Sequence, residues 1–131
     1  MERHDLLDLL TRTAHDAGFA VLDLDLALSD DTATVAFQAT YTGSTAEDIA
    51  SDFEDAAEHV GSPRVTRMLE YFAEEWRHVA DQMHAAGALA ASALEDDEPE
   101  LAELATGHVQ DAVSALAELE LDLSEQAEVF A

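Results

Sequence analysis

The chain has 131 residues and carries 30 Asp and Glu against five Arg and no Lys, which gives a formal net charge of -25. Its hydrophobic content of 48% excludes the highly charged, weakly hydrophobic class of disordered chains. The absence of Cys excludes a disulfide scaffold, a thiolate metal site and a Cys nucleophile. The length predicts one domain over residues 1–131, with a first part at 4–44 and a helical part at 45–131.

The acidic residues are scattered along the whole chain, and the apolar residues are mostly Ala, Leu and Val. This composition resembles that of proteins from extreme halophiles that accumulate salt. At ~1 M salt the Debye length is about 3 Å, so the self-repulsion of the chain is screened. We therefore expect carboxylates on every exposed face and a stability that rises with salt. The alternative is an acidic mimic of nucleic acid or a partner of basic proteins, which would concentrate its carboxylates in one stripe.

No targeting or membrane segment is expected. The first ten residues, MERHDLLDLL, contain acids where a signal peptide needs an apolar core. The longest uncharged apolar-like run, residues 85–94, is shorter than the ~20 residues that span a bilayer. These features predict a soluble cytoplasmic protein.

The first part of the chain is predicted to be a helix followed by a β-hairpin. Residues 4–17 have helical apolar spacing, and Gly18 would end that helix. Residues 19–29 and 32–42 then alternate apolar and polar positions around Asp30–Asp31, a pattern typical of two antiparallel strands. Pairing about this turn places four leucines opposite four apolar residues, namely Leu22, Leu24, Leu26 and Leu28 opposite Ala39, Phe37, Val35 and Ala33.

The second part is predicted to be helical. A capping box at residues 44–47 would begin a helix that ends at Gly61, and Ser62–Pro63 would begin a longer one over residues 63–94. Apolar residues of that long helix repeat at alternating spacings of 4 and 3, as in a coiled-coil seam. The EDDEP segment, 95–99, leads into a last helix at 99–119, and Ser124 would cap one further turn. The predicted fold is therefore α+β and mostly helical, in the order α-β-β-α-α-α, with a two-stranded hairpin packed on a helical bundle.

The length of the helix over residues 63–94 predicts a homodimer. It would be ~48 Å long, whereas a compact globule of this size is roughly 36 Å across, so the helix either bends at Gly87 or projects. A projecting seam of small residues needs a partner helix, and the open edges of a two-stranded hairpin also invite one.

The segment EYFAEEWRHVADQMH, residues 70–84, contains a Glu-x-x-His pattern, Glu75 to His78, that could mark a metal site. The heptad assigns Trp76 and Met83 to the inside, leaves His78 outside and places Glu75 beside the seam. No second Glu-x-x-His occurs on another helix. We therefore predict a solvated helix face, no metal site and no cofactor; Glu75 and His78 are the ligands of the metal alternative.

Three further positions are candidate binding residues. His108 lies within the apolar stripe of the last helix, where an imidazole needs a hydrogen-bond partner or titrates, so it is either a satisfied core histidine or a group that contacts a ligand. Arg64 and Arg67 lie near the start of a helix, where the dipole disfavours cations. They pair either with carboxylates of the preceding helix or, together with the free amides of the helix end, with a phosphate or carboxylate.

The leading functional hypothesis is a non-enzymatic protein that binds another protein, as an adaptor, a chaperone-like protein or a regulatory dimer. Binding would use the hairpin edge or the Ala-rich end of the long helices. The alternative is a sensor or enzyme with a small-molecule or metal pocket near Trp76, Met83 and His108. A third candidate is a transcription-associated regulator, although five Arg against 30 acids make no basic patch and nucleic-acid binding is not expected.

Overall fold

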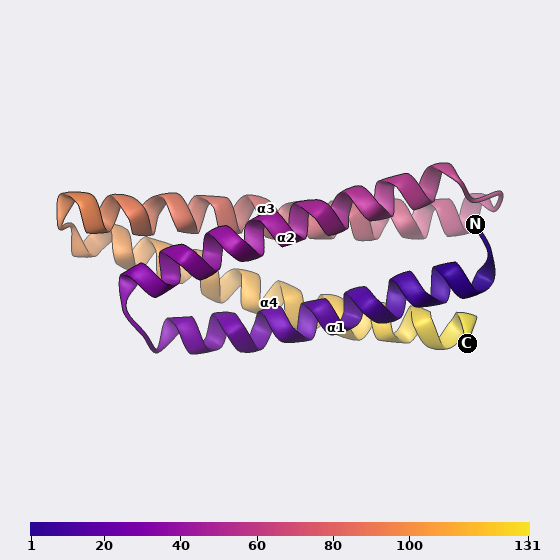
Figure 1. Ribbon diagram of the computed structural model, residues 1–131, viewed down its shortest axis with the longest axis horizontal. Helices are drawn as coiled ribbons and strands as arrows, with labels where there is room; N and C mark the ends of the chain where they lie inside the picture. Colours follow the sequence, from indigo (N-terminus) through magenta and orange to yellow (C-terminus); the bar gives the residue numbers. More distant parts are fainter.

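The computed structural model describes all residues from 1 to 131, of which 91% are helical. It is an all-α four-helix bundle without strands, and its helices are α1 (Arg3–Leu28), α2 (Thr32–Glu58), α3 (Pro63–Asp96) and α4 (Pro99–Phe130). Successive helices run in opposite directions, and both ends of the chain lie at the same end of the bundle (Figure 1). Arg3 links these ends, because its side chain donates hydrogen bonds of 2.7 and 2.8 Å to the carbonyl oxygens of Phe130 and Ala131.

The predicted β-hairpin is wrong, and with it the α+β fold class. Residues 19–28 belong to α1, and residues 32–42 begin α2. Leu24 and Ala27 are buried, whereas Leu22 and Leu26 point outward. The alternating pattern therefore combines two apolar stripes of one helix, one facing inward and one facing outward, and does not represent the two faces of a strand.

Three helix-end signals also proved wrong. Gly18 does not end a helix but lies inside α1, which is tolerated because an interior glycine costs only about 1 kcal/mol. The capping-box pattern at residues 44–47 lies inside α2. There the carboxylate of Glu47 pairs with the His84 ring of α3 at 3.2 Å and caps no helix. Ser124 likewise lies inside α4, which continues to Phe130.

The long helical hairpin is confirmed. Ser62 caps α3 by accepting a hydrogen bond from the backbone N–H of Val65, and Pro63 is its first residue. The helix runs through Gly87 without a break and ends at Asp96, after which Asp97 adopts the left-handed conformation. The turn from α3 to α4 projects beyond the turn from α1 to α2 (Figure 1). The predicted seam forms the buried face of α3, which includes Leu69, Phe72, Trp76, Val79, Met83, Ala86, Ala90 and Ala93.

Small residues bring α2 and α3 close together. A Cβ atom added to Gly43 would lie 3.1 Å from the His84 ring and 3.2 Å from Cβ of Met83. A Cβ atom added to Gly87 would lie only 2.7 Å from Oγ1 of Thr40. α2 makes its most extensive contact with α3, and α1 makes its most extensive contact with α4. The contact between the neighbouring helices α1 and α2 is much smaller. The bundle is thus tight on the α2–α3 side and loose along the α1–α2 seam.

Carboxylates occupy exposed positions on all four helices, as the composition predicts; examples are Asp8, Asp52, Glu74 and Glu118. None of the helices has a stretch that is both long enough and apolar enough to cross a membrane.

Asp31 is the N-cap of α2, and its removal should change how stability depends on pH in the acid range. Its carboxylate accepts hydrogen bonds from the backbone N–H and the hydroxyl of Thr34, both at 2.8 Å. The backbone hydrogen bond, followed by the hydroxyl, lowers the pKa of Asp31 below its ordinary value of 3.8. Because the pKa is depressed in the folded state, this stabilisation is present above pH 3.8 and is lost as the pH falls through the folded-state pKa.

We expect Asp31→Asn to keep the cap but to flatten the fall in stability at acid pH, and Asp31→Ala to weaken stability near neutral pH as well. Denaturant unfolding at a series of pH values measures both effects. Asp25→Asn removes another exposed aspartate of the same region and is the control. If Asp31→Asn and Asp25→Asn give the same pH profile, the carboxylate of Asp31 has no special role.

Candidate functional site

The predicted pocket residues lie mostly in the core. Trp76 and Met83 are fully buried in the α3 seam, and His108 is half-buried on α4. Five pockets at the surface of the molecule have other lining residues, and none of the five includes Trp76, Met83 or His108. The Nε1 atom of Trp76 is buried without a hydrogen-bond partner, so the indole contributes to the core through packing alone.

The two candidate arginines do not pair with the carboxylates of the preceding helix. Glu54 instead forms an ion pair with Arg77, with its Oε1 atom 2.6 Å from Nη2 of Arg77. Neither Arg64 nor Arg67 forms an ion pair. Arg64 borders an open pocket of about 380 Å³ between the start of α3 and the end of α4, which is lined by Ser62, Arg64, Val65, Met68, Gln126, Val129 and Phe130.

The Glu-x-x-His pattern lies where the heptad places it. His78 is exposed and Glu75 is only partly covered. No group of three or more His, Asp or Glu side chains is arranged so that it could hold a metal ion. The carboxylate of Glu75 instead acts on Tyr71. Burial raises the pKa of Tyr71, and the negative charge of Glu75 raises it further.

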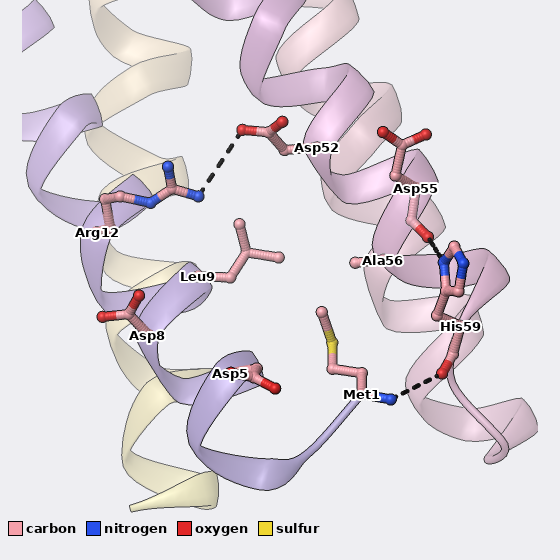
Figure 2. Close-up of a pocket in the computed structure, with 9 residues that line it drawn as sticks. All are labelled: Met1, Asp5, Asp8, Leu9, Arg12, Asp52, Asp55, Ala56 and His59. Carbon is pink, nitrogen blue, oxygen red and sulfur yellow. Dashed lines mark hydrogen bonds and ion pairs between the residues drawn. The ribbon is translucent and has the colours of Figure 1, made fainter.

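The α1–α2 seam contains an open pocket of about 330 Å³, whose lining residues are drawn in Figure 2. Leu9 and Ala56 supply its apolar surface from the two helices, and the side chain of Met1 extends between them (Figure 2). Two polar links cross the seam. Arg12 Nη2 lies 3.7 Å from the carboxylate of Asp52, and the N-terminal ammonium donates a 3.1 Å hydrogen bond to the carbonyl of His59.

The rim of this pocket is acidic, with Asp5 and Asp8 on α1 and Asp52 and Asp55 on α2. Its positive groups, Arg12 and the N-terminus, are the ones already engaged across the seam. Both links are exposed to solvent, and exposed ion pairs contribute little to stability, typically below about 1 kcal/mol. The seam is therefore held weakly at this end.

A second pocket, of about 230 Å³, lies further along the same seam. It brings together Phe19 of α1 and Tyr41 of α2, with Asp16, Ala20, Asp23, Thr42 and Thr45 completing its lining. Phe19 and Tyr41 are both mostly exposed although they are aromatic. This pocket therefore marks the point at which the seam meets an apolar part of the surface.

That part of the surface consists of five large apolar side chains, which we call the apolar face: Phe19, Leu22, Leu26, Phe37 and Tyr41. Each is between 60% and 72% exposed. Residues 19–26 of α1 run alongside residues 34–41 of α2, because the antiparallel helices are joined by a turn of only three residues. Phe37 and Tyr41 stack on each other with ring centroids 6.5 Å apart. The apolar face thus combines an exposed stripe of α1 with a stacked aromatic pair of α2, and Phe19 and Tyr41 meet at the second pocket.

Sequence reasoning missed this face because it assigned the same residues to a hairpin. Leu22, Leu26 and Phe37 were expected to lie together on one face of two paired strands. A signal was nevertheless present, since Phe19, Leu22 and Leu26 follow one another at spacings of 3 and 4, the spacing of one helix face. A helix with that stripe in addition to its core stripe has more apolar surface than a bundle can bury.

The fold and the apolar face define an antiparallel four-helix bundle with one loosely packed seam and an exposed aromatic and aliphatic patch beside it. Comparisons with protein-family models, with curated proteins and with solved structures give no match to the chain.

Proposed function

We propose that this protein works by binding another protein chain at the apolar face of α1 and α2, without catalysis of its own. The observation that carries the proposal is the exposure of five large apolar side chains on neighbouring parts of α1 and α2, where Phe19 and Tyr41 line one pocket. Single exposed apolar residues are normal on a protein surface, but a patch of this size next to polar residues is typical of a protein-binding site. Aromatic side chains are also the residues that contribute most to the energy of such interfaces.

The projecting turn of α3 and α4 is the other location at which binding was expected. Leu94 and Leu104 are exposed there, but they lie on two helices without an aromatic neighbour among the exposed residues. The apolar face has three aromatic rings, and two of them, Phe19 and Tyr41, line the second pocket of the α1–α2 seam. The apolar face is therefore the better candidate.

The proposal is tested by affinity capture in a high-salt extract, with the tagged chain as bait and quantitative mass spectrometry as the measurement. We expect the Phe19→Ser/Tyr41→Ser bait to lose at least one protein that the unchanged bait retains, with an untagged copy of the chain counted among the proteins. The matched control is Leu121→Ser, which changes a leucine that is 65% exposed on α4. The proposal fails if the double variant and the control capture the same proteins in the same amounts.

A further inference from the structure

The α1 part of the apolar face has the spacing of a helix that packs against another helix. His15, Phe19, Leu22 and Leu26 are separated by 4, 3 and 4 residues, and all four are exposed. Alternating spacings of 3 and 4 are those of the a and d positions of two-stranded helix packing. In α1 this outer stripe adds to a complete core stripe, so no part of the same bundle covers it.

The exposed area is close to what a protein interface needs. Side chains of this size that are 60% to 72% exposed present together roughly 600 Å². The largest apolar patch on a typical monomer covers about 300–600 Å². In a standard interface each partner buries about 800 Å², so this patch supplies most of one side.

Resting on the proposed function, we infer that the occupant of the apolar face is a second copy of this chain, with the two α1 helices antiparallel across a twofold axis near Leu22. The stripe is complementary to itself in this arrangement, because Phe19 of each copy then meets Leu26 of the other on both sides of the axis. A twofold axis makes every such contact occur twice. The stacked rings of Phe37 and Tyr41 flank the α1 pair and lengthen the interface on the α2 side.

The charges beside the stripe make the association of two copies depend on salt. Asp16, Asp23 and Asp25 flank the stripe, and the nearest arginine of α1, Arg12, is paired with Asp52. Two copies therefore bring like charges together, which opposes association when the Debye length is long. Salt screens that repulsion and strengthens apolar burial, so association of two copies should rise with salt. Binding of a basic helix to the same aspartates would fall with salt.

The test is the mass of the purified chain by light scattering across a salt series from about 0.1 M to about 2 M. We expect the mass to double from 14.1 kDa as salt rises. Leu22→Glu/Leu26→Glu should weaken the dimer by about 100-fold or more, because each copy loses two buried leucines. Leu121→Glu, at a comparably exposed leucine of α4, should leave the dimer unchanged. Circular dichroism checks that each variant keeps its helices.

The absence of Cys allows a second, geometric measurement. Leu22→Cys should form a disulfide between two copies under mild oxidation, because only a twofold axis near residue 22 brings these positions within the ~4.4–6.8 Å between Cα atoms that a disulfide needs. Leu121→Cys should not cross-link. A chain that stays monomeric throughout the salt series, or a dimer that resists the double substitution or fails to cross-link through residue 22, overturns the inference. If the chain is monomeric but the Phe19→Ser/Tyr41→Ser bait still loses another protein, the proposed function survives and only the second copy is wrong.

Discussion

Replacing Trp76 by Ala is expected to lower the free energy of unfolding by about 3–5 kcal/mol. Trp76 is 1% exposed and lies in the α3 seam between Phe72 and Val79, where all three side chains are buried in the shared core. Removing the indole leaves a cavity that helices fixed at both ends cannot fully close. Denaturant unfolding in high salt, followed by circular dichroism, measures the loss; fluorescence is unsuitable because Trp76 is the only tryptophan of the chain.

Two related variants separate packing from other effects of the substitution. Trp76→Phe keeps a ring in the core and removes the buried indole N–H that has no partner, so it should cost less than half as much as Trp76→Ala. Tyr71→Ala removes an aromatic side chain that is 49% exposed on the same helix and should cost about 1 kcal/mol or less. If Trp76→Ala and Tyr71→Ala were equally destabilising, Trp76 would not be a central core residue.

The sequence predicts the second half of this fold well and the first half poorly, for one physical reason. In α3 the apolar residues form a single stripe, so the alternating spacings of 4 and 3 have only one interpretation and Ser62–Pro63 gives its start. In α1 two apolar stripes interleave, one facing the core and one facing outward. Over residues 22–28 the two stripes together place leucine at every second position, which is also the pattern of a half-buried strand.

The same overlap explains why the apolar face could not be predicted. An exposed apolar stripe can be located only when it is known which leucines are buried in the core. Tertiary packing decides which leucines are buried. Leu24 and Leu26 are two residues apart in one sequence pattern, yet Leu24 is fully buried and Leu26 is mostly exposed. By contrast, the placement of His78 outside the seam follows from the heptad alone, because α3 has no competing stripe.

The loose seam and the apolar face belong to the same side of the bundle, and a common cause connects them. The small residues of α2, Gly43 among them, lie in close contact with α3. α1 makes its main contact with α4, and the space between α1 and α2 is left as two pockets bordered by aspartates. An interface across the outer side of α1 and α2 would clamp these two helices to each other, which the bundle itself does only through exposed polar links such as Arg12–Asp52.

Introducing a side chain at Gly87 is expected to have the second large effect, because it would force α2 and α3 apart. The first added atom would lie 2.7 Å from Oγ1 of Thr40, a distance that real Cβ atoms do not show. That hydroxyl donates a 2.9 Å hydrogen bond to the carbonyl of Ala36, so moving it away breaks a contact. We expect Gly87→Ala to lower the free energy of unfolding by ~1–2 kcal/mol and Gly87→Leu by ~3 kcal/mol, the range for overpacked cores.

The chain offers a matched control for helix propensity. Gly107 lies inside α4 with nothing within 4 Å of an added Cβ atom, so Gly107→Ala should raise the free energy of unfolding by about 0.5–1 kcal/mol. The opposite signs of the two Gly→Ala substitutions would isolate the cost of close helix packing. Thr40→Ala should restore at least half of the loss in the Gly87→Ala background, because the next nearest atoms, at 3.6 and 3.7 Å, are at ordinary contact distance. A stabilising Gly87→Ala, or no rescue by Thr40→Ala, would show that α2 and α3 do not depend on this contact.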